Sequence, residues 1–139
     1  MPDRSTTAAR RHHEDTAEDG YFAFLAQGKY VLLTTDRPKG APVSVRVPGI
    51  VDGDRAYVRV RSRSDADKHL RQGKLVQVAA CDGLGLVSYG MPRYATPRPV
   101  PAEDAERVAG QLSATYPSRW GFLHRGQDCY QLLVPYGPA

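Results

Sequence analysis

A concentration of cationic side chains in residues 55–74 is the part of this sequence best suited to chemistry. Seven basic residues stand there against only Asp65 and Asp67, namely Arg55, Arg59, Arg61, Arg63, Lys68, Arg71 and Lys74. The 139-residue chain has a formal net charge of +4, so this segment accounts for the whole excess. A charge run is usually a solvated face, but this one also suits a site for a phosphate or another anion.

A helix predicted over residues 64–72 would organise several of these cations. Ser64 is a suitable N-cap, and Gly73 can end the helix. The N-terminus of a helix attracts anions. Lys68 and Arg71 follow Ser64 by one and two turns, so they share its face, and Arg59 would lie on the neighbouring strand. These four residues form either a phosphate cradle or a cap with exposed charges.

Other chemistries find less support in the sequence. Cys81 and Cys129 are far apart and show no metal-ligand spacing, so we expect no metal site. A disulfide between them is possible but unsupported, because nothing indicates export. No nucleophile–base order or phosphate-binding glycine loop is recognisable, and no catalytic residue is assigned. Tyr89, Tyr94 and Tyr116 are candidates for a substrate cavity, although aromatic side chains more often pack.

The composition predicts one globular domain. Hydrophobic residues make up 41% and charged residues 24% of the chain. No apolar stretch reaches the roughly 20 residues that a membrane-spanning helix needs. Residues 1–18 read as a disordered polar tail without the apolar core of a signal peptide, and residues 19–139 as the domain. We therefore expect a cytoplasmic protein.

Alternating apolar and polar residues predict short strands joined by hairpins. The strands are expected at 29–35, 42–51, 56–61, 75–81 and 129–134, with two pieces at 86–89 and 93–96. Hairpin loops are expected at 36–40 and 52–54. Helices are expected at 19–28, 64–72 and 102–115, and Pro97, Pro99 and Pro101 should exclude regular structure. The pattern favours a mainly β fold with some α: a six-stranded antiparallel barrel with two or three short helices.

An ordered set of short motifs then points to a known family. The motifs are Leu33-Thr-Thr followed by Gly40, Pro42-Val-Ser44-x-x-Val47, Asp52-Gly53, Tyr57-Val-Arg59, Ser64-x-x-x-Lys68-x-Leu70-Arg71 and Val76-x-Val-Ala79-x-Cys81-Asp82. In this order and spacing they resemble the split-barrel flavin and deazaflavin oxidoreductases of the pyridoxamine-5′-phosphate-oxidase-like superfamily. The nearest branch is the actinobacterial one described as F420-dependent. The resemblance covers residues 29–82 well and the rest of the domain weakly.

The resemblance implies a split β-barrel that binds F420, or alternatively FMN, and transfers a hydride to an unsaturated or carbonyl-containing small molecule. It implies that the strand at 42–47 lies along the cofactor ring, with backbone amides at Val43 and the hydroxyl of Ser44 near the ring edge. Arg46 would offset the negative charge of the reduced ring. The cofactor phosphate would be held by Arg59, Arg61, Ser64, Lys68 and Arg71. A homodimer with the cofactor at the subunit seam is also implied.

Two other hypotheses remain open. The sequence departs from the family pattern at Val45, Arg46, Pro48 and Ala66, which favours a repurposed barrel with a non-redox ligand-binding or catalytic role. Nucleic-acid binding through residues 55–74 ranks last, because no recognised nucleic-acid motif is present.

Overall fold

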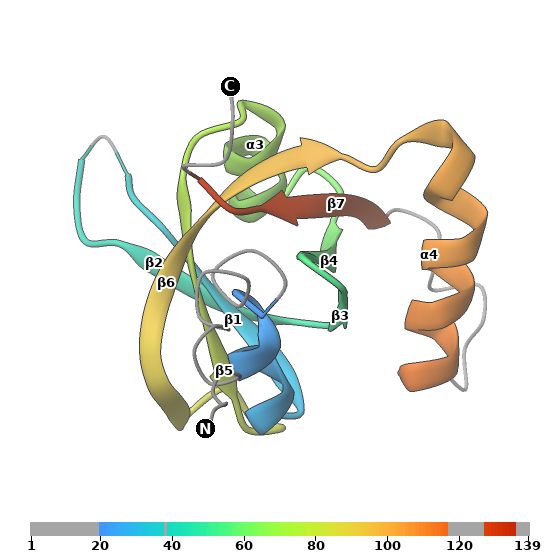
Figure 1. The fold of residues 1–139 in the computed structure, drawn as a ribbon. Helices are drawn as coiled ribbons and strands as arrows, with labels where there is room; N and C mark the ends of the chain where they lie inside the picture. The colour runs from blue at the N-terminus through green and yellow to red at the C-terminus, as the bar shows by residue number, and fades with distance from the viewer. Residues whose placement is uncertain (1–19, 38, 117–126, 136–139) are drawn as a thin grey trace.

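The computed structural model describes residues 20–37, 39–116 and 127–135, and the predicted tail at 1–18 lies outside these ranges. The chain forms mostly strands with a few helices (Figure 1). In chain order the elements are the 3₁₀ helix η1 (Ala23–Gln27), β1 (Tyr30–Thr35), β2 (Val43–Val47), β3 (Gly49–Asp52), β4 (Arg55–Arg61), α3 (Asp65–Arg71), β5 (Val76–Cys81), β6 (Ser88–Pro99), α4 (Ala102–Thr115) and β7 (Gln127–Leu133).

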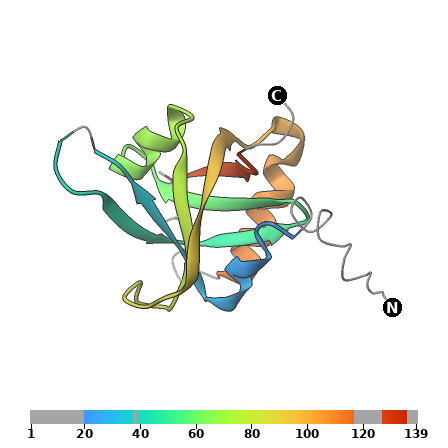
Figure 2. The same ribbon diagram turned by 60° about the vertical axis from the view of Figure 1, so that its left-hand side comes forward.

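The strands form one antiparallel sheet of seven in the order β2-β1-β5-β6-β7-β4-β3. We expected six strands in a barrel, whereas the described residues form seven strands in an open sheet. The count rises because the predicted strand at 42–51 divides at Pro48 into β2 and β3. These two strands form opposite edges of an open sheet, although only one residue separates them in the chain. The sheet curls so that both edges approach β4 (Figure 2). The Arg59 N–H donates to the Pro48 carbonyl at 3.1 Å.

The long strand β6 corrects a second expectation. Residues 86–89 and 93–96 were expected as separate pieces, yet β6 continues from Ser88 to Pro99 through three prolines. Its first part pairs with β5, whereas Thr96–Pro99 pair with β7 and with no other strand among the described residues. Proline lacks the N–H donor of a ladder and is tolerated at an edge. The second part of β6 is such a local edge, which explains why Pro97 and Pro99 do not end the strand.

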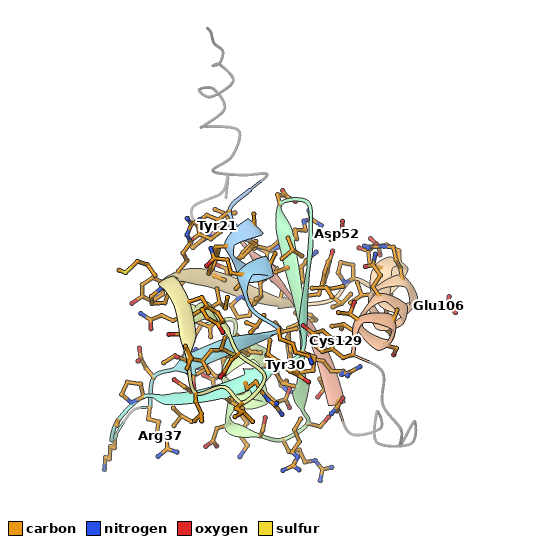
Figure 3. The ribbon with its side chains drawn as sticks, turned by 90° about the horizontal axis from the view of Figure 1, so that it is seen from below. Tyr21, Tyr30, Arg37, Asp52, Glu106 and Cys129 are labelled. Atoms are coloured by element: carbon orange, nitrogen blue, oxygen red, sulfur yellow. The ribbon has the colours of Figure 1, made fainter. Side chains whose placement is uncertain are left out.

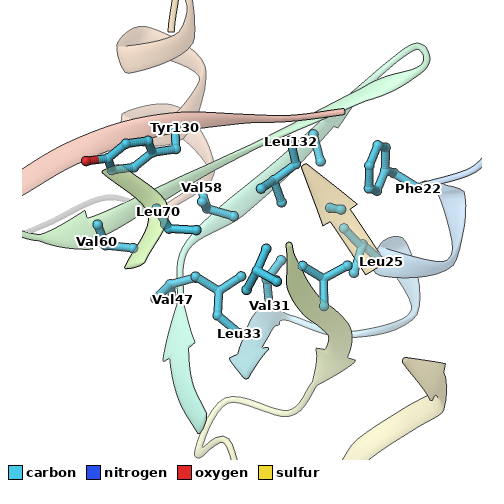
Figure 4. Close-up of a cluster of buried hydrophobic side chains, with 14 of the residues drawn as sticks. Phe22, Leu25, Val31, Leu33, Val47, Val58, Val60, Leu70, Tyr130 and Leu132 are labelled. Carbon is cyan, nitrogen blue, oxygen red and sulfur yellow. The ribbon is translucent and has the colours of Figure 1, made fainter. Parts of the chain in front are cut away.

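The main core lies on the inner face of the curled sheet. Figure 4 shows side chains from η1, β1, β2, β4, α3 and β7 pointing toward one another. The largest fully buried members include Phe22, Leu33, Leu70 and Leu132. Alternation in β1 follows the expected period, with Val31, Leu33 and Thr35 buried and the residues between them half-buried. The hydrophobic pattern thus sets which face of β1 closes the core.

Helix α4 covers the outer face of β4 and β7 (Figure 1). Val108 and Leu112, four residues apart, pack against Tyr57 of β4 as the predicted helix face requires. Arg107 secures the helix by an ion pair with Asp52 at 2.6 Å. Within the described ranges, none of the helices has both the length and the apolar surface for crossing a membrane.

The segment before β1 is shorter than the helix expected at 19–28. Only Ala23–Gln27 is helical, as a 3₁₀ turn, and Phe22 and Leu25 enter the core. Gly28 does not end it in a left-handed conformation, since its backbone is extended (φ −116°, ψ 166°). A side chain at Gly28 would place its Cβ 2.5 Å from the backbone of Cys81. Close strand approach, rather than helix capping, requires this glycine.

Candidate functional site

A large cleft lies where β2, β4, the start of α3 and the end of α4 meet. Its volume is about 950 Å³, within the range of pockets that take cofactors and other small molecules. Its lining combines apolar, aromatic and cationic side chains: Lys29, Tyr30, Thr35, Val43, Val45, Arg46, Val47, Pro48, Arg59, Val60, Arg61, Ser64, Asp65, Ala66, Thr115, Tyr116 and Gln127.

The cleft has a strong excess of positive charge. Lys29, Arg46, Arg59 and Arg61 face a single carboxylate, Asp65, whose oxygen lies 3.6 Å from Arg37. Among the residues that the structure describes, Arg59 and Arg61 form no ion pair. The Arg59 Nε atom is buried and has no hydrogen-bond partner there. A buried donor without an acceptor costs about 1–3 kcal/mol, so an anionic ligand would relieve a local defect.

An aromatic wall stands beside these cations. The Arg46 guanidinium lies 4.4 Å from the centre of the Tyr30 ring, and Tyr30 lies 5.1 Å from Tyr116. Figure 3 shows Tyr30 in the middle of the molecule, away from the hairpin tips marked by Arg37 and Asp52. The Tyr116 hydroxyl is within hydrogen-bond distance of the Lys29 carbonyl (2.8 Å) and the Gly49 carbonyl (2.7 Å). Burial raises the pKa of Tyr116, so it remains a donor and joins α4 to the entrance of β1.

The structure brings five of the eight predicted cofactor residues into this cleft: Val43, Arg46, Arg59, Arg61 and Ser64. Lys68 lies instead in a neighbouring cleft of about 680 Å³ between the β1–β2 loop and α3. Ser44 lines neither cleft and exchanges a 2.7 Å hydrogen bond with Thr34. Arg71 also lines neither, since it contacts Asp67 at 2.9 Å and Asp128 at 3.4 Å. A cofactor role stays a prediction for all eight residues.

The capping role of Ser64 is confirmed. Its hydroxyl donates to the Arg61 carbonyl at 2.6 Å and accepts from the Asp67 N–H at 3.1 Å. Both interactions hold the turn before α3, a helix of seven residues. The hydroxyl is therefore engaged within the chain, and Arg59 and Arg61 are the better placed anion ligands.

Several cleft residues escaped the sequence interpretation. Lys29 and Tyr30 enter the cleft because β1 begins beside Pro48, and Gln127 enters because β7 pairs with β4 through Arg61. Of the three tyrosines considered for a cavity, Tyr116 lines the cleft, whereas Tyr89 and Tyr94 are exposed and line neither described cleft. The one sequence signal that could have predicted Tyr30 as a cleft residue is its place beside Lys29 at the start of an apolar strand.

A buried carboxylate lies behind the cleft. Asp67 is 1% exposed and accepts hydrogen bonds from the Tyr130 hydroxyl (2.6 Å), the Arg63 N–H (2.8 Å) and Arg71 (2.9 Å). Burial acts to raise the pKa of Asp67, but these three donors together hold it below the usual 3.8. Burial and the bond to Asp67 raise the pKa of Tyr130, which keeps its proton available to the carboxylate.

This arrangement predicts an acid-sensitive contribution to stability. The folded-state pKa of Asp67 lies below its unfolded value, so the ionised carboxylate stabilises the folded state above pH 3.8. That contribution is lost as the pH falls from about 4 through the folded-state pKa. Urea unfolding across this range should show a steeper acid loss in the wild type than in Asp67→Asn. The neighbouring exposed carboxylate provides the control, since Asp65→Asn should keep the wild-type slope.

The two thiols have no reactive environment. Cys81 is buried, Cys129 is partly buried, and both are free. Burial raises the pKa of each thiol, which disfavours the nucleophilic thiolate. No cluster of three or more His, Cys, Asp or Glu side chains suited to a metal occurs in residues 20–37, 39–116 and 127–135.

Comparison with known proteins establishes the fold but not a family. No family model matches the sequence, and no curated protein matches it. A *Listeria innocua* protein described as a candidate pyridoxamine 5′-phosphate oxidase has a similar structure, with a TM-score of 0.58, 16% identity, and coverage of 84% of this chain and 92% of its own. A *Bacteroides thetaiotaomicron* protein described as a candidate 5-nitroimidazole antibiotic resistance protein has a TM-score of 0.59, 11% identity, and coverage of 81% and 76%. The chain has a fold of the pyridoxamine-oxidase-like split-barrel type.

Proposed function

We propose that this chain is an oxidoreductase that binds F420, or alternatively FMN, in the large cleft and reduces an unsaturated or carbonyl-containing small molecule. The observation that carries the proposal is the cleft's four cations against one carboxylate, with the Arg59 Nε buried and without a partner in the described chain. The shared fold and the motifs of residues 29–82 support it.

The residues present fit such a cofactor. Arg59 and Arg61 offer charged donors for a phosphate, and charge-assisted bonds of this kind are the stronger ones. Val43, Val45 and Pro48 offer an apolar surface for a planar ring, and Arg46 lies beside them to stabilise negative charge. When bound, the cofactor would supply hydride transfer. The chain's own task would be to bind the anionic tail, orient the ring and exclude water from one of its faces.

One observation favours a second candidate function. All four departures from the family pattern, Val45, Arg46, Pro48 and Ala66, line the large cleft. A change of ligand would alter these positions first, because they would contact it. The alternative is therefore a split barrel that binds a different anionic small molecule without redox chemistry.

Fluorescence titration of the purified protein with F420, in parallel with FMN, tests the proposal. Binding at micromolar concentration or tighter by either cofactor is the expected result, and the tighter one identifies the cofactor. Binding of neither would overturn the redox proposal and favour the second candidate. A screen of anionic metabolites by thermal shift would then be the appropriate experiment.

Free cysteines agree with a reducing compartment, and we propose a cytoplasmic location. Fractionation of the native host with an antibody against this chain would test that proposal. Recovery in the soluble cytoplasmic fraction is the expected outcome, and recovery in the medium would contradict it.

We also propose that the chain forms a homodimer through the β5–β6 hairpin and the first part of β6. Every residue from Ser88 to Tyr94 is exposed, although this stretch lies in a strand. The surrounding apolar side chains are uncovered: Leu84, Leu86, Val87, Tyr89, Met91 and Tyr94. Apolar patches of this kind mark association surfaces. Arg46 donates to the Gly83 carbonyl, so a partner seated on this hairpin would lie beside the cleft.

Light scattering after size exclusion should give twice the chain mass of 15.3 kDa. Leu86→Asp and Met91→Asp, at side chains 79% and 81% exposed, should give monomers because each places a charge in the apolar contact. Val51→Asp, at an exposed valine of β3, should leave the dimer intact. A wild-type monomer at tens of micromolar would contradict the proposal.

A further inference from the structure

The turn between β4 and α3 contains a strained residue. Arg63 has φ +67°, and it is the sole non-glycine residue with positive φ in the described chain. The left-handed region costs an ordinary L-residue about 1–2 kcal/mol. Such a conformation persists only where surrounding contacts determine it.

Besides the bonds of the Ser64 N–H and hydroxyl to the Arg61 carbonyl, the buried carboxylate of Asp67 contacts Arg63 itself and holds its backbone in this turn. Its Oδ2 atom accepts the Arg63 N–H at 2.8 Å and also the Arg71 guanidinium at 2.9 Å. Its Oδ1 atom accepts the Tyr130 hydroxyl at 2.6 Å, which fixes the carboxylate to β7. Asp67 is 1% exposed, so its carboxylate is shielded from water that would compete for these hydrogen bonds. Arg63 is thus held from the core side, while its own side chain is exposed.

The turn leads directly into the cationic end of the large cleft. Arg61 precedes it, Ser64 follows it, and both line the cleft, whereas Asp67 and Arg63 do not. Ser62, which directly follows Arg61, donates its hydroxyl to the Asp128 carboxylate at 2.9 Å. Arg71 contacts the same carboxylate. Asp128 and Asp67 thus hold Ser62 and Arg63, the two residues between Arg61 and Ser64.

We propose that Asp67 is a positioning residue for anion recognition: by holding Arg63 in the left-handed conformation, it aims Arg61 at the phosphate of the bound ligand. This inference rests on the proposed function, since it assumes a phosphate-bearing cofactor in the cleft. It assigns a role to Asp67 that is separate from its contribution to stability. The consequence is selective: affinity for the phosphate group depends on Asp67, whereas affinity for the ring does not.

Two substitutions at one exposed position isolate the backbone effect. Arg63→Gly and Arg63→Val remove the same side chain, but only glycine accepts φ +67° without strain. The ligands are FMN and riboflavin, which share a ring and differ by the phosphate; F420 and its phosphate-free deazaflavin replace them if F420 binds tighter. Arg63→Val should lose about tenfold in affinity for the phosphorylated ligand, the loss expected when one charge-assisted bond is misaligned. Its affinity for the phosphate-free ligand should change by less than about twofold, and Arg63→Gly should match the wild type for both.

Substitution of the carboxylate completes the test. Asp67→Ala should reproduce the selective loss, and Asp67→Asn should not, because the amide oxygen can still accept the Arg63 N–H. Adding Arg63→Gly to Asp67→Ala should restore the phosphate-dependent affinity, although not the lost stability. If Asp67→Ala does not fold, the Arg63 pair still decides the matter on a surface residue.

The outcomes separate this inference from the proposed function. A wild type that binds neither cofactor, or that binds the phosphate-free ligand equally well, refutes the cofactor or phosphate assignment itself. If the wild type prefers the phosphorylated ligand but Arg63→Val and Arg63→Gly bind that ligand with equal affinity, only the positioning role is overturned. Equal loss for both ligands in Arg63→Val and Asp67→Ala would overturn it too, because that is the result of general destabilisation.

Discussion

Arg59→Met is expected to weaken binding of the anionic cofactor by about ten- to a hundredfold, the equivalent of ~1.5–3 kcal/mol for a lost charge-assisted hydrogen bond. Methionine keeps most of the side-chain length and removes the charge. The guanidinium lies in the cleft, and its buried Nε has no partner within the described part of the chain. Isothermal titration or fluorescence titration with F420 and FMN would measure the loss.

The same substitution should behave differently in an unfolding experiment. Replacement of an unsatisfied buried donor by an apolar group is expected to raise the free energy of unfolding of the free protein by about 1 kcal/mol. A residue that weakens stability while it strengthens binding is typical of a functional site. Urea unfolding without ligand therefore provides an independent measurement on the same variant.

Arg55→Met is the matched control for this experiment. Arg55 begins the same strand, is 45% exposed at its side chain, lies near Asp54 and does not line either described cleft. Its substitution should leave cofactor affinity within about twofold of the wild type, because exposed ion pairs contribute little. Equal losses in Arg55→Met and Arg59→Met would contradict a local site and indicate non-specific attraction by net charge.

Leu70→Ala is expected to give the largest loss of stability, about 2–5 kcal/mol in the free energy of unfolding. Leu70 is 0% exposed and is the larger of the two α3 side chains in the main core, the other being Ala66 (Figure 4). Truncation removes apolar contacts and leaves a cavity that a seven-residue helix between β4 and β5 cannot readily close. Denaturant unfolding followed by circular dichroism would measure it.

Leu75→Ala makes the corresponding change five positions later. Leu75 is 52% exposed, so its truncation should cost less than about 0.5 kcal/mol. Similar losses of stability in the two variants would contradict the packing of Leu70, and with it α3, against the sheet. That result would also remove the support on which the turn from Arg61 to Ser64 depends.

Local patterns were sufficient to predict several elements. Ser64 predicts the start of a capped helix. In the structure α3 begins directly after it, and the Ser64 hydroxyl accepts the Asp67 N–H as a cap. Asp52-Gly53-Asp54 predicts a tight hairpin. Gly53 has the positive φ (+67°) that the turn between β3 and β4 needs. Val108 and Leu112 announce the buried face of α4. Each of these features depends on residues within one or two turns of chain, so the sequence carries it.

Features that depend on distant strands were not accessible in the same way. Pro97 and Pro99 lie in a strand because, in the described part of the chain, β7 is the only strand that pairs with β6 there. No local sequence pattern shows which strands will be neighbours. The charge count predicted an anion site in residues 55–74. It did not predict that Lys68 would line a second cleft or that Arg71 would form an ion pair with Asp67.

The sequence by itself therefore determined the strand and helix content, the hairpin turns and the cationic character of the site, because these follow from short-range periodicity and side-chain type. Only the tertiary structure decided that Lys29 joins the predicted Arg46, Arg59 and Arg61 in the cleft, and that Lys68 and Arg71 do not line it. It joins Lys29 and Arg46 to Arg59 and Arg61 because β2 and β3 bend around Pro48 onto β4. It also buries the carboxylate of Asp67, since Asp67 and Tyr130 meet only when α3 and β7 fold against each other. Long-range pairing is set by the burial of the whole core, and no segment encodes that by itself.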